Sequence, residues 1–172
     1  LLVLDAVERI EVSVRAVWAY YMAHHHGTHA HLDSTLAKKY GFWFKDKDSL
    51  EKEVLRSDET FITHMRQTYS ESLPPVWASC EVMSLGLLSR WYENLGPMKT
   101  RSAIASTYSL NESTLASWLR HLTVVRNTCA HHSRLWNRDF SVTPAMPGNK
   151  PSGLSSQWAS NSRKIYNSFL II

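Results

Sequence analysis

The apolar residues at the start of the chain recur with the period of an α-helix. Successive members of this stripe are four, three, four, three and four residues apart, the spacing that gathers side chains on one face of a helix. The stripe consists of Val3, Val7, Ile10, Val14, Val17 and Tyr21, and it is widened by Leu4 and Trp18. It predicts a long first helix that ends before Gly27, a residue suited to a helix C-terminus.

Glycine and proline are scarce throughout the chain. Only six residues of each type occur among 172, too few for the many turns of a β-sandwich. Hydrophobic residues make up 44% of the chain, enough to form one sizeable core. These proportions predict an all-α fold in which residues 1–172 form a single helical domain. Because the first residue is Leu1 rather than methionine, we expect the chain to be a fragment of a longer protein.

Further helices are predicted from apolar periodicity, N-cap residues and helix breakers. The predicted helices span residues 48–69 with Asp48 as N-cap, 76–94, 98–107, a segment that follows Asn111 as N-cap and runs into Arg126, and 154–170. Residues 27–47 have little periodicity, so we expect an irregular, loop-rich insertion there. In this insertion Gly41–Phe44 is expected to pack as an aromatic plug beneath a loop. Residues 143–151 have the composition of a loop.

Positive charge is concentrated in the second part of the chain. Residues 1–96 carry a net charge of −3 and residues 97–172 a net charge of +7. A polyanion such as RNA would be attracted to such a surface, although a solvated basic surface explains the same distribution. No Gly-rich phosphate loop is present, which argues against a nucleoside-triphosphate enzyme.

The cysteines and the hydropathy pattern indicate a compartment. Cys80 and Cys129 have no spacing typical of a disulfide framework, so a reducing compartment and hence the cytoplasm are expected. No run of 18 apolar residues occurs, and we therefore expect no membrane-spanning segment.

Chemistry is suggested by the segment Arg126-Asn127-Thr128-Cys129-Ala130-His131. RNA can be cleaved without a metal ion when the adjacent 2′-hydroxyl attacks the phosphorus, a reaction that needs a group able to move protons near neutral pH. Histidine has that property, and an arginine guanidinium can bind the oxygens of the negatively charged transition state. Basic residues also occur at ordinary helix C-termini, where they interact favourably with the helix dipole.

This segment resembles the Arg-x4-6-His motif of HEPN ribonucleases, including the polar residue after the arginine. The chain is more closely similar to the Abi-like abortive-infection family, phage-defence proteins with a HEPN domain, over residues 4–11, 77–88 and 125–138. The resemblance implies a HEPN-like helical bundle and a metal-independent endoribonuclease, a toxin that needs no cofactor. It also implies catalytic roles for Arg126, Asn127 and His131 in a cleft shared by the two copies of a homodimer. Such a toxin could have an antitoxin or a regulatory RNA as a further partner.

Helix geometry restricts how the motif residues meet. Asn127 and His131 are four residues apart, so the Asn127 amide can hydrogen-bond the imidazole and fix its tautomer. At about 100° per residue, Arg126 lies roughly 140° around the helix from His131, a constraint that a second protomer would relax. His132 also satisfies the motif spacing, and we favour His131 because of its position relative to Asn127.

The residues that follow the motif are candidates for holding RNA. Arg134 and Arg138 could clamp the substrate, with Trp136 stacking on a base. The residue types by themselves favour the other interpretation, in which Trp136 caps the core and the two arginines are solvated.

Two acidic residues of the first helix are candidates for supporting the site. Glu8 could orient Arg126 or the histidine, and Glu11 could do so less readily, because an i,i+4 ion pair with Arg15 explains Glu11 equally well.

Five histidines occur within residues 24–31. Imidazoles can bind zinc, nickel or copper, so a metal-binding protein is one alternative function. The spacing matches no specific zinc pattern, and we favour a polar helix end and loop without a metal. A further alternative is a non-catalytic HEPN module that binds RNA or a partner protein.

Overall fold

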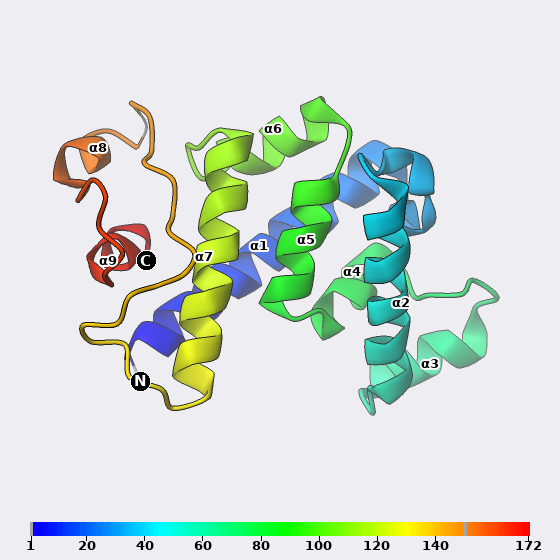
Figure 1. Cartoon of the computed structure of the whole chain (residues 1–172). Coiled ribbons are helices and arrows are strands. Elements are labelled where there is room, and N and C mark those ends of the chain that lie inside the picture. The colour runs from blue at the N-terminus through cyan, green and yellow to red at the C-terminus, as the bar shows by residue number, and fades with distance from the viewer. Residues whose placement is uncertain (1, 150) are drawn as a thin grey trace. The chain divides into compact units, whose positions relative to one another are not determined.

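The structure, a computed structural model, describes residues 2–149 and 151–172. In this part of the chain the fold is built from helices (Figure 1). Within these residues no β-strand is formed, and the isolated bridge between Ala37 and Leu95 is the one β-type pairing. The prediction of an all-α fold is therefore confirmed. Leu1 and Lys150 lie outside the described residues. The sequence places Leu1 in the region of the first helix and Lys150 in the loop 143–151.

The chain divides into two compact units. One, here the terminal unit, comprises the described residues of Leu1–Ser13 and Ala105–Ile172, and the other, the middle unit, comprises Val14–Ile104. Helix α1 (Leu2–His26) contributes residues to both, and it ends where predicted. Gly27 has φ +96°, and its N–H donates to the Ala23 carbonyl at 3.0 Å, so the residue that stops the helix adopts the left-handed conformation that favours glycine.

The middle unit consists of short helices packed around apolar side chains that include Trp18, Leu50 and Tyr92. Its elements, besides part of α1, are η1 (Ala30–Leu32), η2 (Ser34–Leu36), α2 (Tyr40–Arg56), α3 (Thr60–Thr68), α4 (Val76–Ser79), η3 (Cys80–Val82), α5 (Leu85–Asn94) and most of α6 (Met98–Ser106). The short helix expected over residues 98–107 is α6. Leu50 and Tyr92 are fully buried, and they come from α2 and α5, which lie against each other.

The predicted start of a helix at Asp48 is wrong. Helix α2 begins at Tyr40, and Asp48 lies within it, where its carboxylate accepts a hydrogen bond from Lys52 Nζ at 2.7 Å. Gly41–Phe44 is consequently the first turn of a helix rather than an aromatic plug, and Phe42 and Phe44 are 53% and 58% exposed. The N-cap pattern consists of a polar residue followed three positions later by an acid. The same pair of residues also occurs inside helices as ordinary i,i+3 neighbours, so the pattern does not distinguish the start of a helix from its interior.

Two of the predicted helices are each divided in the structure. The segment 48–69 breaks after Arg56, where Ser57 Oγ accepts the Glu59 N–H at 3.3 Å and so offers the backbone a local alternative to the helix. The segment 76–94 breaks before α5, where Ser84 Oγ accepts the Leu87 N–H at 3.2 Å and caps a new helix.

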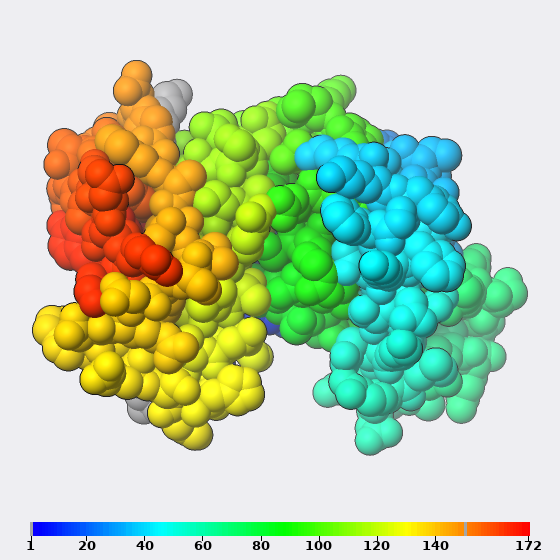
Figure 2. Space-filling model, viewed as in Figure 1, coloured from blue at the N-terminus to red at the C-terminus, as the bar shows by residue number. Residues whose placement is uncertain are grey.

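The terminal unit is organised around α7 (Glu112–Ala130), which begins as predicted. Asn111 Oδ1 accepts the Thr114 N–H at 2.8 Å and caps the helix. Residues 143–149 and 151 lie outside helices, as expected. In Figure 2 the C-terminal segment, in orange and red, lies against the yellow-green surface of α7, and the indole rings of Trp118 and Trp158 stack at 6.0 Å between centroids.

The single C-terminal helix predicted over residues 154–170 is replaced by α8 (Leu154–Gln157) and α9 (Tyr166–Ile171). Asn167 explains the interruption, because its side-chain amide bonds both the N–H and the carbonyl of Ala159 at 3.0 Å. His121 of α7 also lies 2.7 Å from Ser168 Oγ and 2.7 Å from the Val142 carbonyl. The chain therefore satisfies its polar groups through long-range contacts instead of continuing the helix.

His31 is a fully buried histidine in the middle unit. Its Nε2 lies 3.4 Å from Ser79 Oγ, which donates to the Pro74 carbonyl at 2.7 Å, and its Nδ1 has no hydrogen-bond partner among the residues that the structure describes. Burial, assisted by the nearby His29 and Lys47, lowers the pKa of His31 from 6.5 to about 4. The folded protein therefore holds this imidazole neutral.

We expect His31 to make the stability of the protein depend on pH. Because its folded pKa lies below its unfolded value, the unfolded chain binds the proton first, and stability that is complete above pH 6.5 is lost as pH falls towards about 4. The loss attributable to His31 is on the order of 3 kcal/mol. Denaturant unfolding measured across this range for the wild type and for His31→Gln should show a flatter profile for the variant, and equal slopes would contradict the assignment.

Candidate functional site

Arg126 of α7 forms an ion pair with Glu11 of α1. Arg126 Nε lies 3.8 Å from Glu11 Oε2, and the two side chains are 35% and 6% exposed. Arg126 Nε is buried without a hydrogen bond, and within the described residues no hydrogen bond reaches the rest of this guanidinium either. The arginine is thus held by charge while its donors stay available to an anionic ligand.

Glu11 is buried because it lies on the inner face of α1. Val7, Val14 and Trp18 are each at most 1% exposed, and Glu11 continues their spacing of four, three and four residues. The apolar stripe drawn from the sequence instead passed through Ile10 and Val17, which are only half-buried. An acid in register with three buried apolar residues was the signal that sequence reasoning missed.

The sequence also ranked Glu8 above Glu11 as a supporting residue. In the structure Glu8 is exposed, whereas Glu11 contacts Arg126. The acid beside the motif arginine is therefore Glu11.

The C-terminus of α7 is closed by two backbone hydrogen bonds beyond the helix. His132 N–H donates to the Cys129 carbonyl and Ser133 N–H to the Thr128 carbonyl, both at 2.9 Å. This is the pattern of a Schellman motif, whose left-handed position is usually glycine. Here that position is His132, with φ +53°, a conformation that costs a non-glycine residue about 1–2 kcal/mol.

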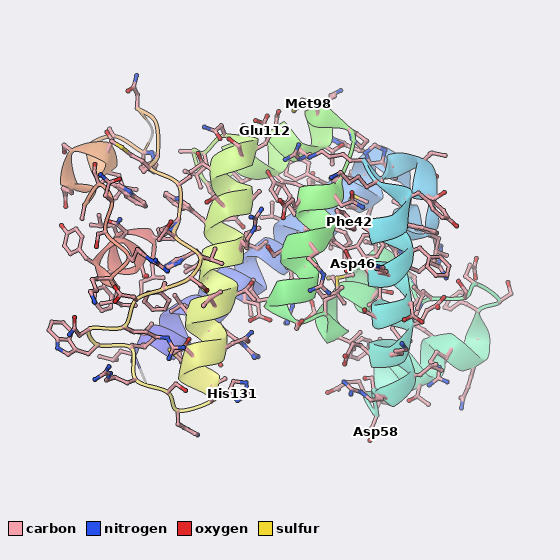
Figure 3. The ribbon with its side chains drawn as sticks, viewed as in Figure 1. Phe42, Asp46, Asp58, Met98, Glu112 and His131 are labelled. Atoms are coloured by element: carbon pink, nitrogen blue, oxygen red, sulfur yellow. The ribbon has the colours of Figure 1, made fainter. Side chains whose placement is uncertain are left out.

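His131 is the C-cap of α7, with φ −88° and ψ 15°, and its side chain is exposed at the end of the helix (Figure 3). Asn127 and His131 are linked through the backbone, because the His131 N–H donates to the Asn127 carbonyl at 3.0 Å. The side-chain hydrogen bond expected between these residues is not formed in the described structure, since His131 has already left helical geometry. Asn127 is exposed as well.

Arg126 and His131 do not contact each other within one copy of the described chain. Arg126 faces Glu11, while His131 extends from the end of the helix. One copy thus presents an arginine and a histidine of the motif separately, consistent with the angular separation expected from helix geometry.

The segment after α7 is exposed. Arg134 and Arg138 lie on the surface, and Trp136 is 76% exposed. The alternative in which Trp136 caps the core is therefore wrong. These three side chains remain available for a ligand.

The histidine-rich segment is divided among separate contacts. His25 Nδ1 and His26 Nε2 lie 2.9 and 2.8 Å from the same atom, Thr100 Oγ1, and the His24 ring packs 4.2 Å from that of Tyr20. Among the residues described, no three or more His, Cys, Asp or Glu side chains gather in a way that could hold a metal ion. The metal-binding alternative has no geometric support here.

Within the described residues, no helix combines the length and apolar character needed to cross a bilayer.

Comparison with known proteins gives a family. No curated protein and no solved structure matches the chain. The family model described as Abi-like protein matches residues 1–137, a range that contains Glu11, Arg126 and His131. The match covers most of the 172 residues, and the chain therefore belongs to the Abi-like protein family.

Proposed function

We propose that this protein is a metal-independent endoribonuclease of phage defence that acts by abortive infection. The observation that carries the proposal is the placement of Arg126, charge-paired to a buried carboxylate but with its hydrogen-bond donors unused, five residues before an exposed histidine. Membership of the Abi-like family and the resemblance of this segment to the Arg-x4-6-His motif support the same reading. The basic second part of the chain suits RNA, which such an enzyme would encounter in the cytoplasm.

The proposed reaction is cleavage by the substrate's own 2′-hydroxyl. The imidazole of His131 accepts the 2′-hydroxyl proton as that oxygen attacks phosphorus, and the same imidazole, now protonated, donates a proton to the departing 5′-oxygen. Arg126 binds the non-bridging oxygens as negative charge accumulates on them. The products are a 2′,3′-cyclic phosphate and a 5′-hydroxyl, and no metal ion or cofactor takes part.

A second copy of the chain completes this site in the proposal. One chain presents Arg126 and His131 apart from each other, so each proposed cleft takes Arg126 from one copy and His131 from the other. A two-fold axis supplies both pairs at once, since the same surface then faces itself. In this arrangement the exposed Asn127 orients an imidazole or the substrate, and Arg134, Trp136 and Arg138 hold the RNA.

The first prediction is that the protein cleaves single-stranded RNA in EDTA. Arg126→Gln and His131→Ala should each lower the rate by about 100-fold or more, the usual contribution of an acid–base group. Arg126→Gln is preferred to alanine because it keeps much of the packing around Glu11. Product end groups and rates are read on denaturing gels, with circular dichroism to establish that each variant is folded.

Two histidine variants serve as controls. His64→Ala removes an exposed histidine of α3 and should leave cleavage unchanged. His132→Gly suits the left-handed backbone at that position, and retained cleavage would assign the catalytic role to His131 rather than His132. Cleavage that survives both Arg126→Gln and His131→Ala would refute the site. Intact RNA with a persistent gel shift would instead indicate a non-catalytic RNA-binding module.

The second prediction concerns the shared site. If Arg126 of one copy acts with His131 of the other, a refolded mixture of the two inactive variants restores activity, because one cleft of each mixed dimer is intact. Random pairing gives about a quarter of the wild-type rate. Separately refolded variants combined only in the assay are the matched control. A mixture as inactive as its components would rule out a site built from both copies.

The third prediction is that Glu11 positions Arg126. Glu11→Gln removes the charge that holds the guanidinium, so we expect the rate of cleavage to fall by about tenfold, equivalent to 1.4 kcal/mol of transition-state stabilisation. Glu8→Gln, on the exposed side of the same helix, should have a much smaller effect.

A double-mutant cycle distinguishes positioning from general destabilisation. Unfolding free energies of the wild type, Glu11→Gln, Arg126→Gln and the double variant should give a coupling of about 1–2 kcal/mol, between the values for exposed and buried ion pairs. Additive effects, together with an unaltered rate for Glu11→Gln, would show that Glu11 has no role in the site.

A further inference from the structure

Arg101 is a buried cation for which the described residues supply no anionic partner. This residue of α6 is 8% exposed, and its Nε is buried without a hydrogen bond. Its guanidinium lies over the ring of Tyr92, with Cζ 5.7 Å from the ring centroid. In the described part of the chain no salt bridge or hydrogen bond reaches the guanidinium.

An unpaired buried charge is costly. Removing an ion from water costs several kcal/mol even after the protein relaxes, and folded proteins offset this cost with a counter-ion and hydrogen bonds. A cation–π contact recovers only about 0.5–2 kcal/mol. The same unit shows the usual solution at Arg90, whose Nε donates to the buried Asp46 carboxylate at 2.6 Å. Arg101 lacks such a carboxylate.

The groups around Arg101 add positive charge. Lys38 Nζ reaches the backbone of Glu93, the residue after Tyr92, over whose ring Arg101 lies. Burial and the charge of Arg101 lower the pKa of Lys38, while Glu93 partly opposes this. Lys38 Nζ donates to the Glu93 backbone carbonyl at 2.8 Å and is exposed to solvent. Glu93 thus acts on Lys38.

The start of α6 contributes further hydrogen-bond donors. This helix begins at Met98, labelled in Figure 3, after Gly96 and Pro97. The Arg101 N–H donates to the Pro97 carbonyl at 3.1 Å, so the N–H groups before it lie at the positive end of the helix. Thr100 is held at this end by the two imidazoles of His25 and His26.

We propose that Arg101, Lys38 and the first turn of α6 form a binding site for a tetrahedral phosphate-type anion, which we call the Arg101 site. A guanidinium can donate two parallel hydrogen bonds to phosphate oxygens, and a helix N-terminus and an ammonium group stabilise the same charge. The ligand is a terminal phosphate, because a guanidinium as buried as this one is reached by the tip of a ligand and not by a phosphodiester with a nucleoside on either side. The Arg101 site shares no residue with the Arg126 segment and does not depend on nuclease activity.

Titration with inorganic phosphate tests the site directly. Phosphate at about 100 times its Kd should raise the Tm of the wild-type protein by at least about 5 °C, beyond the effect of chloride at equal ionic strength. Calorimetric Kd values should rise at least tenfold for Arg101→Gln and severalfold for Lys38→Gln. Arg66→Gln, an exposed arginine of α3, is the matched control and should bind phosphate like the wild type.

The unliganded proteins give a second readout. Arg101→Met removes an uncompensated charge, so its Tm without phosphate should equal or exceed that of the wild type, and phosphate should no longer raise it. A general salting effect of phosphate would stabilise every variant equally, and that result would overturn the proposal. Lys38→Gln changes an exposed residue, so unchanged phosphate affinity in this variant counts against the site even if the Arg101 variants fail to fold.

Two ligand sources are separated by paired probes. Adenosine 5′-monophosphate is compared with adenosine, and a 5′-phosphorylated 2′-O-methyl oligonucleotide with its 5′-hydroxyl form, since 2′-O-methyl RNA cannot be cleaved by 2′-hydroxyl attack. Binding of the mononucleotide alone identifies a free nucleotide as the ligand, and binding of the phosphorylated oligonucleotide identifies an RNA end. Equal affinity for the phosphorylated and unphosphorylated member of both pairs would overturn the assignment.

Discussion

The site in the terminal unit depends on one electrostatic constraint, the burial of the Glu11 carboxylate. Glu11 is 4% exposed, and burying its negative charge is costly unless a cation lies beside it; Arg126 Nε lies 3.8 Å from Glu11 Oε2. The consequence reaches beyond stability. Because its Nε faces Glu11, the arginine is fixed near the end of α7 with its remaining donors unused, the state in which it can bind a phosphate without first breaking hydrogen bonds.

The end of α7 determines how the rest of the motif is displayed. The Schellman hydrogen bonds require a left-handed residue, and the chain places His132 there instead of glycine. A histidine retained in a strained backbone position is more informative than one within the helix, because strain of this kind persists where the surrounding structure or a function requires it. The turn also moves His131 out of helical geometry and leads the chain into the exposed segment of Arg134, Trp136 and Arg138.

Local sequence signals predicted those elements that local chemistry determines. The length of α1, its stop at Gly27 and the Asn111 cap of α7 each rest on a few neighbouring residues, and each is found in the structure. Helix α2 was misplaced because its first turn has exposed aromatic residues, which periodicity reads as irregular. The partner of Arg126 could not be read from the motif, because the choice between Glu8 and Glu11 depends on which face of α1 is buried, a property of tertiary packing.

The two arginines of most interest differ in what the fold has provided for them. Arg126 is compensated by a carboxylate of its own chain, so its charge is already balanced and it can act on a ligand that becomes more negative during a reaction. Arg101 has an aromatic ring beneath it and one further cation, Lys38, acting with it, so the missing negative charge must be supplied from outside for the electrostatics to balance. The environment of Arg126 suits stabilisation of a transition state, whereas that of Arg101 suits tight binding of a ground-state anion. One chain can therefore be assigned both phosphodiester cleavage and phosphate binding, each with its own arginine.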